Sequence, residues 1–126
     1  MVRSVGTVLL RLIIETETTF PSNMKVYLDD LRRLPDGWEP AYTADEAIVL
    51  LRTGIVTEIS LDHDLGDSKL CGEGYDVLLW IEEQVAKHGM VPPMMHVHTS
   101  NIPARDRMLL AIQSINATYS VLLSKN

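Results

Sequence analysis

Three clusters of charged and polar residues in this 126-residue chain have the types and spacing that cation binding and proton transfer require. The acidic pair Asp29–Asp30 follows the run MKVYL, residues 62–64 (DHD) follow EISL, and residues 98–101 (HTSN) follow MMHV. Carboxylates that lie close together repel one another unless a cation compensates their charge, and imidazole titrates near neutral pH. What the clusters can do therefore depends on whether the fold brings them together.

Strands are expected directly before each cluster, because MKVYL, EISL and MMHVH are short apolar runs of strand length. The stretch LRRLPDGWEP contains two prolines and a glycine and is expected to be a loop, followed by a short strand around Ala41 and Tyr42. The run TYSVLL, residues 118–123, is expected to form a fifth strand.

Helices are expected between these strands. Residues 43–54 carry the clearest signals, since Thr43 and Glu46 have the spacing of a capping box. A second helix is predicted over residues 75–87, closed by a glycine, and a third begins at the HTSN cluster and continues through residues 108–112.

Short apolar strands that alternate with helices predict an α/β fold: a three-layer sandwich with a central parallel sheet covered on both faces. All strands of such a sheet point the same way, so the clusters that follow them meet at one edge. Open α/β sheets bind their ligands outside the carboxyl ends of the strands. The three clusters are therefore expected to form one site.

A magnesium site is the chemistry that this convergence favours. Oxygen ligands on loops suit Mg²⁺, which keeps part of its water shell and is commonly completed by a phosphate. We predict that Asp29, Asp30 and Asp62 share one Mg²⁺ ion. Taken singly, an aspartate after a strand, such as Asp30 or Asp64, is more often a turn former or a helix cap.

The overall composition describes one ordinary globular domain, with 46% hydrophobic and 22% charged residues. A net charge of −6 argues against broad nucleic-acid binding, which needs basic surface. The single cysteine, Cys71, allows no internal disulfide, so we expect a cytoplasmic protein and treat this thiol as incidental. Nothing in the composition indicates the oligomeric state.

Residues 1–23 are expected to be an extension of a domain that spans residues 24–126. The extension contains an apolar stretch that resembles a secretory signal, but Arg11 interrupts it and two glutamates follow where a cleavage site belongs. It is also too short to span a bilayer. We expect an extra strand or an amphipathic helix that packs on the domain, in preference to a disordered tail. The segment can also come from an upstream start, and no membrane partner is expected.

The motifs of the chain resemble two related families. The acidic pair, the strand-ending Asp62 and a Thr or Ser after the fourth strand are similar to the receiver domain of bacterial response regulators. A closer resemblance is to the cyclic-phosphate processing receiver domain family, carried by KVYLDDLRRLPDGWEP, EISLDHDLGD, GYDVLLWIEE and HVHTSN. This resemblance covers roughly residues 24–115 and implies a receiver (flavodoxin-like) topology in a bacterial or phage protein.

The resemblance implies a function as well. In receiver domains the acidic residues bind magnesium, the aspartate of strand three accepts a phosphoryl group, and a lysine after strand five completes the site. Here only Lys125 follows the expected last strand, and almost no chain remains for a final helix, so the C-terminus is shortened. The closer family implies binding and processing of cyclic phosphates, for which two histidines are suited.

His63 and His98 are the candidate proton carriers beside Asp62. Opening a cyclic phosphodiester requires a water that loses a proton and a ribose oxygen that gains one. For His98, a buried histidine bonded to a backbone carbonyl is an equally good explanation. His96 and His88 are expected to be structural, because one lies deeper in the sheet and the other at a helix C-terminus.

Phosphate contacts are expected from guanidinium groups and from the start of the third helix. The candidates are Arg32, Thr99, Ser100, Asn101 and Arg105. Arg33 is a further candidate, helix capping explains Asn101 as well, and each arginine can instead be a solvated surface charge. Trp38 can stack on a base or pack over the edge of the core.

Three functions are consistent with these residues. The first is an enzyme or binding protein for cyclic nucleotides or 2′,3′-cyclic phosphate ends, with Mg²⁺ as cofactor. The second is a stand-alone receiver that is phosphorylated on Asp62 and docks to a partner. The third is a non-catalytic module that binds a ligand or a protein. The two histidines and the missing lysine favour the first, and the sequence does not separate hydrolysis from binding.

Overall fold

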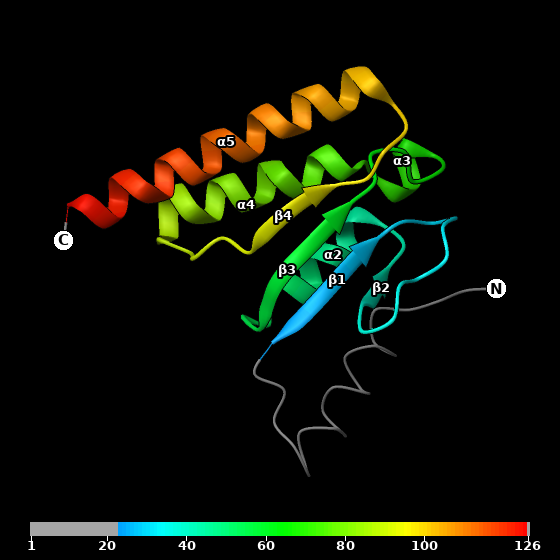
Figure 1. Ribbon diagram of the computed structural model, residues 1–126, viewed down its shortest axis with the longest axis horizontal. Helices are drawn as coiled ribbons and strands as arrows, with labels where there is room; N and C mark the ends of the chain where they lie inside the picture. The colour runs from blue at the N-terminus through cyan, green and yellow to red at the C-terminus, as the bar shows by residue number, and fades with distance from the viewer. Residues whose placement is uncertain (1–22, 126) are drawn as a thin grey trace, which may run out of the picture.

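The computed structural model describes residues 23–125, which form a four-stranded, all-parallel sheet with helices packed on it (Figure 1). The strand order across the sheet is β2-β1-β3-β4. The strands are β1 (Met24–Leu28), β2 (Glu39–Ala41), β3 (Val56–Leu61) and β4 (Met94–Val97). This order places β1 and β3 in the centre, as in a receiver domain, and confirms the predicted α/β class and topology.

Four helices are described: α2 (Ala44–Leu51), α3 (Ser68–Cys71), α4 (Gly74–His88) and α5 (Ile102–Ser124). The expected start of α2 is confirmed, because the Thr43 hydroxyl accepts a hydrogen bond from the Glu46 amide at 3.1 Å. The Glu46 carboxylate bonds the amide of Tyr42, one residue before the position that a capping box requires. The short helix α3 was not predicted.

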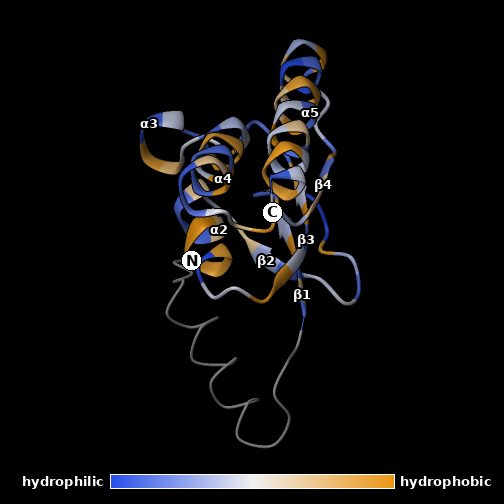
Figure 2. Ribbon diagram, turned by 90° about the vertical axis from the view of Figure 1, so that its left-hand side faces the viewer, coloured by the Kyte–Doolittle hydropathy of each residue, from blue (hydrophilic) through white to orange (hydrophobic). Residues whose placement is uncertain are grey.

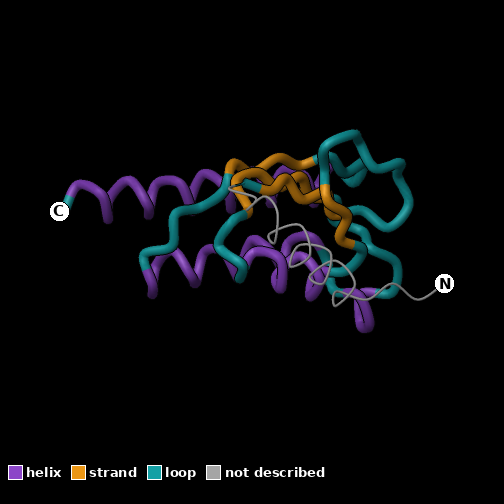
Figure 3. Tube along the Cα trace, turned by 90° about the horizontal axis from the view of Figure 1, so that it is seen from below, coloured by secondary structure: helices purple, strands orange, loops and turns teal. Residues whose placement is uncertain are grey.

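The alternation of side chains along each strand separates two faces of the sheet. Val26, Leu28, Ile59 and Leu61 are fully buried and form one core with apolar residues of α2, α4 and α5. Their neighbours along β1 and β3, among them Tyr27 and Ser60, point to the opposite face. Figures 2 and 3 show α2 and α4 on one side of the sheet, and α5 packs against α4 and the edge strand β4.

The expected fifth strand is wrong: residues 118–123 belong to the long helix α5. Tyr119 and Leu122 pack against the core at the helical spacing that continues from Ile112 and Ile115. An apolar run of six residues fits a buried strand or a helix equally well, and no proline or glycine separates it from the helix before it. The residues that would mark a break between two elements are therefore missing.

The helical end changes the position of Lys125, which caps α5 instead of following a strand. A helix of 23 residues spans about 35 Å, and α5 starts at the carboxyl edge of the sheet and runs away from it (Figure 1). Lys125 therefore does not stand in for the receiver lysine. The predicted N-terminal extension lies outside the described residues except for Asn23, and no described helix is long and apolar enough to cross a membrane.

Candidate metal centre

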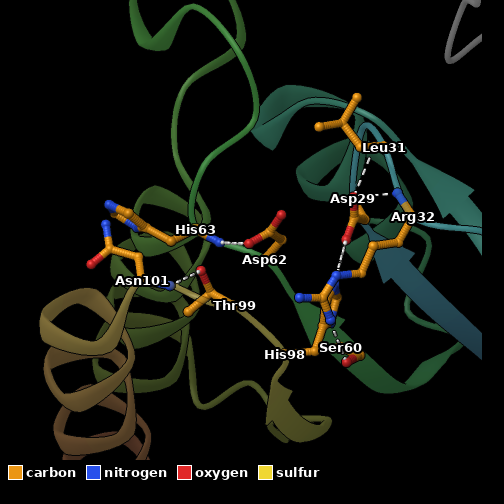
Figure 4. A network of polar contacts seen from close by, with 9 residues as sticks. All are labelled: Asp29, Leu31, Arg32, Ser60, Asp62, His63, His98, Thr99 and Asn101. Carbon is orange, nitrogen blue, oxygen red and sulfur yellow. Dashed lines mark hydrogen bonds and ion pairs between the residues drawn. The ribbon is translucent and has the colours of Figure 1, made fainter.

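Three side chains from three strand ends converge at the carboxyl edge of the sheet (Figure 4). Asp29 follows β1, Asp62 follows β3, and His98 follows β4, and one ligand atom from each lies within 4.8 Å of the others. The backbone fixes this arrangement, since the Asp62 amide donates to the Leu28 carbonyl at 2.9 Å and the His98 amide to the Leu61 carbonyl at 3.0 Å. We call Asp29, Asp62 and His98 the metal cluster.

Asp29 is the most tightly held member of the metal cluster and is only 3% exposed. Its Oδ1 accepts hydrogen bonds from the amides of Leu31 and Arg32 at 2.8 and 2.9 Å, so the loop after β1 folds around the carboxylate. Burial alone would raise the pKa of Asp29, but these amides and His98 outweigh it and lower the pKa. The carboxylate is therefore ionised and available to a cation.

His98 has a partner on each ring nitrogen and on one ring face. Its Nε2 lies 2.9 Å from Asp29 Oδ2, its Nδ1 lies 2.7 Å from Ser60 Oγ, and the ring of Tyr27 stacks on it at 4.3 Å. Burial lowers the pKa of His98, and the nearby carboxylates of Asp29 and Asp62 offset only part of that effect. The imidazole is thus neutral at pH 7, the form in which histidine binds metals.

Ser60 is a functional candidate that the sequence analysis missed. The side chain is 7% exposed and lies on the same sheet face as Asp62, two residues later. A hydroxyl both donates and accepts, so Ser60 can serve either tautomer of His98. When the imidazole Nε2 binds a cation, Nδ1 carries the proton and donates it to Ser60. The two-residue spacing of Ser60 and Asp62 was the available signal.

Asp30, the third predicted magnesium ligand, lies beside the metal cluster and outside its group of close ligand atoms. Its Oδ1 is buried and has no hydrogen-bond partner among the described residues. Burial raises the pKa of Asp30, and the charges of Asp29, Asp62 and Asp64 raise it further. A buried carboxylate oxygen without a partner has room for a proton, a water or an additional cation contact.

The imidazole of His63 points away from the metal cluster (Figure 4). Its backbone amide donates to Asp62 Oδ1 at 2.8 Å, while its Nε2 lies 3.3 Å from Glu73 Oε2 at the start of α4. His63 is 5% exposed, and its Nδ1 has no partner among the described residues. The side chain thus joins the loop after β3 to α4, and only its amide contacts the cluster.

Gly74 positions this loop through its lack of a side chain. Its amide donates to the His63 carbonyl at 3.0 Å, and a Cβ atom at this position would overlap the carbonyl oxygen of Asp62. No side chain fits there without displacing the backbone of Asp62. The glycine in the GYD motif therefore allows α4 to start directly against the metal cluster.

The HTSN segment after β4 acts mainly as the cap of α5. The Asn101 side chain accepts from the Ala104 amide at 3.1 Å, and the buried Thr99 hydroxyl accepts from the Asn101 amide at 3.2 Å. Ser100 is exposed, and Arg105 is exposed on the first turn of α5. Neither of these two makes a side-chain contact with the metal cluster among the described residues.

Arg32 is a predicted phosphate ligand that contacts the metal cluster. Its Nε is 3.7 Å from Asp29 Oδ2, and about half of its side chain is exposed. A guanidinium that is anchored at one end and open at the other can still bind a phosphate oxygen. Arg33 is exposed and pairs with no carboxylate among residues 23–125.

The donor set of the metal cluster fits a divalent cation. Two carboxylates and one neutral imidazole within 4.8 Å of one another match the oxygen-rich sites of Mg²⁺ and Mn²⁺, and imidazole also admits other transition metals. The Asp30 oxygen without a partner adds a further possible contact. The metal cluster contains His98 where the predicted ligand set had Asp30.

A family model described as the cyclic-phosphate processing receiver domain matches residues 24–114 of the chain. This match covers all four strands, α2 to α4, the metal cluster and the first half of α5. No curated protein and no solved structure matches the chain significantly.

Proposed function

The chain belongs to the cyclic-phosphate processing receiver domain family, and on this premise we propose that it binds and hydrolyses a cyclic phosphate of a nucleotide or of an RNA end with the help of Mg²⁺. The observation that supports the proposal most is the group of ligand atoms of Asp29, Asp62 and His98 within 4.8 Å of one another. Loop oxygens at the carboxyl edge of a parallel sheet are a common site for a cation that meets a phosphate.

The residues of the chain have distinct roles in this proposal. When bound, Mg²⁺ offsets the negative charge that develops on the phosphate oxygens. Asp29, Asp62 and His98 hold the cation, and Arg32 contacts a phosphate oxygen through its exposed guanidinium. Since Ser60 holds Nδ1 of His98 and Nε2 faces Asp29 in the metal cluster, we assign His98 to cation binding and not to proton transfer.

Asp30 is the proton carrier that we propose instead of His63 and His98. Its buried Oδ1 has no hydrogen-bond partner among the described residues, and the side chain lines a cavity beside Asp29, a position that suits a group that gains and loses a proton during a reaction. The carboxylate takes a proton from the water that attacks phosphorus. It returns that proton to the ribose oxygen whose bond to phosphorus breaks, which yields a phosphate monoester and a free hydroxyl.

An assay of phosphodiester opening tests this function. The full chain is incubated with MgCl₂ and either 2′,3′-cyclic AMP or 3′,5′-cyclic AMP, and the monoester product is measured. We expect turnover that stops when EDTA is added and that is lost in Asp62→Asn. Turnover that both changes leave intact would contradict the proposal, and Mg²⁺-dependent nucleotide binding without turnover would reduce the domain to a binding module.

A stand-alone receiver phosphorylated on Asp62 is the second candidate, because the fold has receiver topology. The lysine that completes receiver sites does not support this candidate. Lys25 pairs with Glu58 near the start of β1, and Lys125 caps the far end of α5. A beryllofluoride adduct on Asp62 that survives in His98→Asn would favour this function over cyclic-phosphate hydrolysis.

A further inference from the structure

A cavity of about 370 Å³ lies directly beside the metal cluster, between the end of β1, the loop after it and the end of β2. Asp29 contributes to both the cavity and the cluster. We propose that this cavity binds the nucleoside part of a cyclic nucleotide while the cyclic phosphate reaches the metal cluster. This inference rests on the proposed function and adds to it a binding site for the nucleoside of the substrate.

The size of the cavity exceeds what a phosphate group alone requires. Pockets for small organic molecules measure roughly 300 to 1,000 Å³, and this cavity lies at the lower end of that range. A single nucleoside is therefore an occupant of suitable size, whereas a bare cyclic phosphate on a three-carbon backbone would leave much of the volume to water.

On the side next to the metal cluster, the cavity carries positive charges that can bind a phosphate. Arg32 and Arg33 line it next to Asp29 and Asp30. Arg32 is tethered to Asp29 at 3.7 Å, and Arg33 has no carboxylate partner among the described residues. Two guanidinium groups beside a cation site can together balance the charge of a bound phosphate.

The remaining walls are apolar or aromatic, as the flat faces of a nucleobase require. Leu31, Leu34 and Pro40 supply aliphatic surface, and Leu31 is 87% exposed at the rim. Tyr27 lines the cavity with one ring face stacked on His98, so it links the cavity to the metal cluster, and Tyr42 lines the β2 side. Aromatic and aliphatic walls with a few charged groups are the usual lining of a cofactor or nucleotide pocket.

The first test compares two probes that share the cyclic phosphate and differ in the base. The full chain is titrated in MgCl₂ with 2′,3′-cyclic AMP and with glycerol 1,2-cyclic phosphate. We expect the nucleotide to bind roughly tenfold more tightly or better, because contact of one base with aromatic and apolar side chains supplies that much affinity. Equal dissociation constants for the two probes would overturn the inference and leave the proposed function intact.

The second test changes the rim of the cavity. Leu31→Asn, which removes apolar surface without adding charge, should weaken binding of 2′,3′-cyclic AMP roughly fivefold or more and leave glycerol 1,2-cyclic phosphate within a factor of two. Leu70→Asn is the matched control, since Leu70 is 81% exposed on α3 and does not line the cavity. Unchanged nucleotide affinity in Leu31→Asn would overturn the inference. If neither probe binds the wild-type chain while Mg²⁺ does, the proposed function itself fails.

Discussion

Asp29 and His98, 69 residues apart in the sequence, meet through a 2.9 Å contact between Oδ2 and Nε2 at the carboxyl edge of the sheet. The contact joins the ends of β1 and β4 across β3, which supplies Asp62 between them. Backbone amides hold the Asp29 carboxylate, and the Ser60 hydroxyl holds the His98 imidazole. Both side chains therefore keep their positions without a cation. The centre is therefore preorganised for a cation.

Removal of the Ser60 hydroxyl should weaken cation binding. Ser60→Ala deletes the partner of His98 Nδ1, and the loss of such an outer contact typically costs 10–100-fold in metal affinity. We expect a decrease of about that size in calorimetric titration with MgCl₂ or MnCl₂. Thr57→Ala, at an exposed position of the same strand, is the control. Equal affinity in Ser60→Ala and the wild type would contradict the role of this hydroxyl.

Stability in the absence of metal should fall as the solution becomes acidic. The pKa of His98 in the folded chain is below its ordinary value of 6.5. Between these two pKa values the unfolded chain binds a proton at His98 and the folded chain does not. The stabilisation is complete above pH 6.5 and is lost as the pH falls towards the folded pKa of His98. Asp29, whose pKa is also lowered, adds the same trend below its ordinary value of 3.8.

Melting temperatures measured in EDTA between pH 7.5 and pH 5 check the histidine part of this trend. The wild-type chain should lose more stability over this range than His98→Asn, which has no group to protonate there. Parallel curves for the two proteins would show that His98 does not carry the effect. The raised pKa of Asp30 acts in the opposite direction, over a pH range that extends upward from its ordinary value of 3.8. Both proteins carry Asp30, so the difference between their curves reports on His98.

Gly74→Ala should damage both the fold and the metal centre. The new Cβ would overlap the carbonyl oxygen of Asp62, and overpacking of this kind costs roughly 1–3 kcal/mol. Because Asp62 must move, we expect Mg²⁺ affinity to fall together with the melting temperature. Gly89→Ala strains a left-handed position at the end of α4 with no atom within 4 Å, so it should lower stability and leave Mg²⁺ affinity unchanged.

Asp30→Asn separates proton transfer from cation binding. The amide has nearly the shape of the carboxylate but no basic oxygen, so turnover of 2′,3′-cyclic AMP should fall by about 10²–10⁴-fold, the range typical of a lost general base. Mg²⁺ affinity should change much less than in Asp62→Asn, because Asp30 lies outside the group of close ligand atoms. Wild-type turnover in Asp30→Asn would remove this residue from the mechanism.

Much of the centre was predictable because it follows from strand geometry. Asp29, Asp62 and His98 each end an apolar run, and parallel strands bring such positions together. The orientation of the His63 side chain was not predictable. Consecutive residues of an extended segment point to opposite sides, and the sequence does not show that Glu73, just before α4, lies next to His63. The hydroxyl of Ser60 stayed hidden for a related reason, since its partner is 38 residues away.

The helices and strands likewise differ in whether the sequence predicts them. Thr43 and Gly89 mark the ends of α2 and α4 through local backbone chemistry, and the structure confirms both. The residues around Tyr119 carry no local signal that separates a strand from a helix. Their conformation is decided by packing of Tyr119 and Leu122 against the core, which depends on the whole fold.

Calorimetric titration of the full chain with MgCl₂ tests the shared cation site most directly. We expect one bound ion per chain in the wild type, and binding that is lost or at least tenfold weaker in Asp62→Asn and in His98→Asn. Circular dichroism of each variant establishes that it is folded. A folded wild-type chain that binds no divalent cation, or variants that bind it as tightly as the wild type, would show that Asp29, Asp62 and His98 do not share a cation.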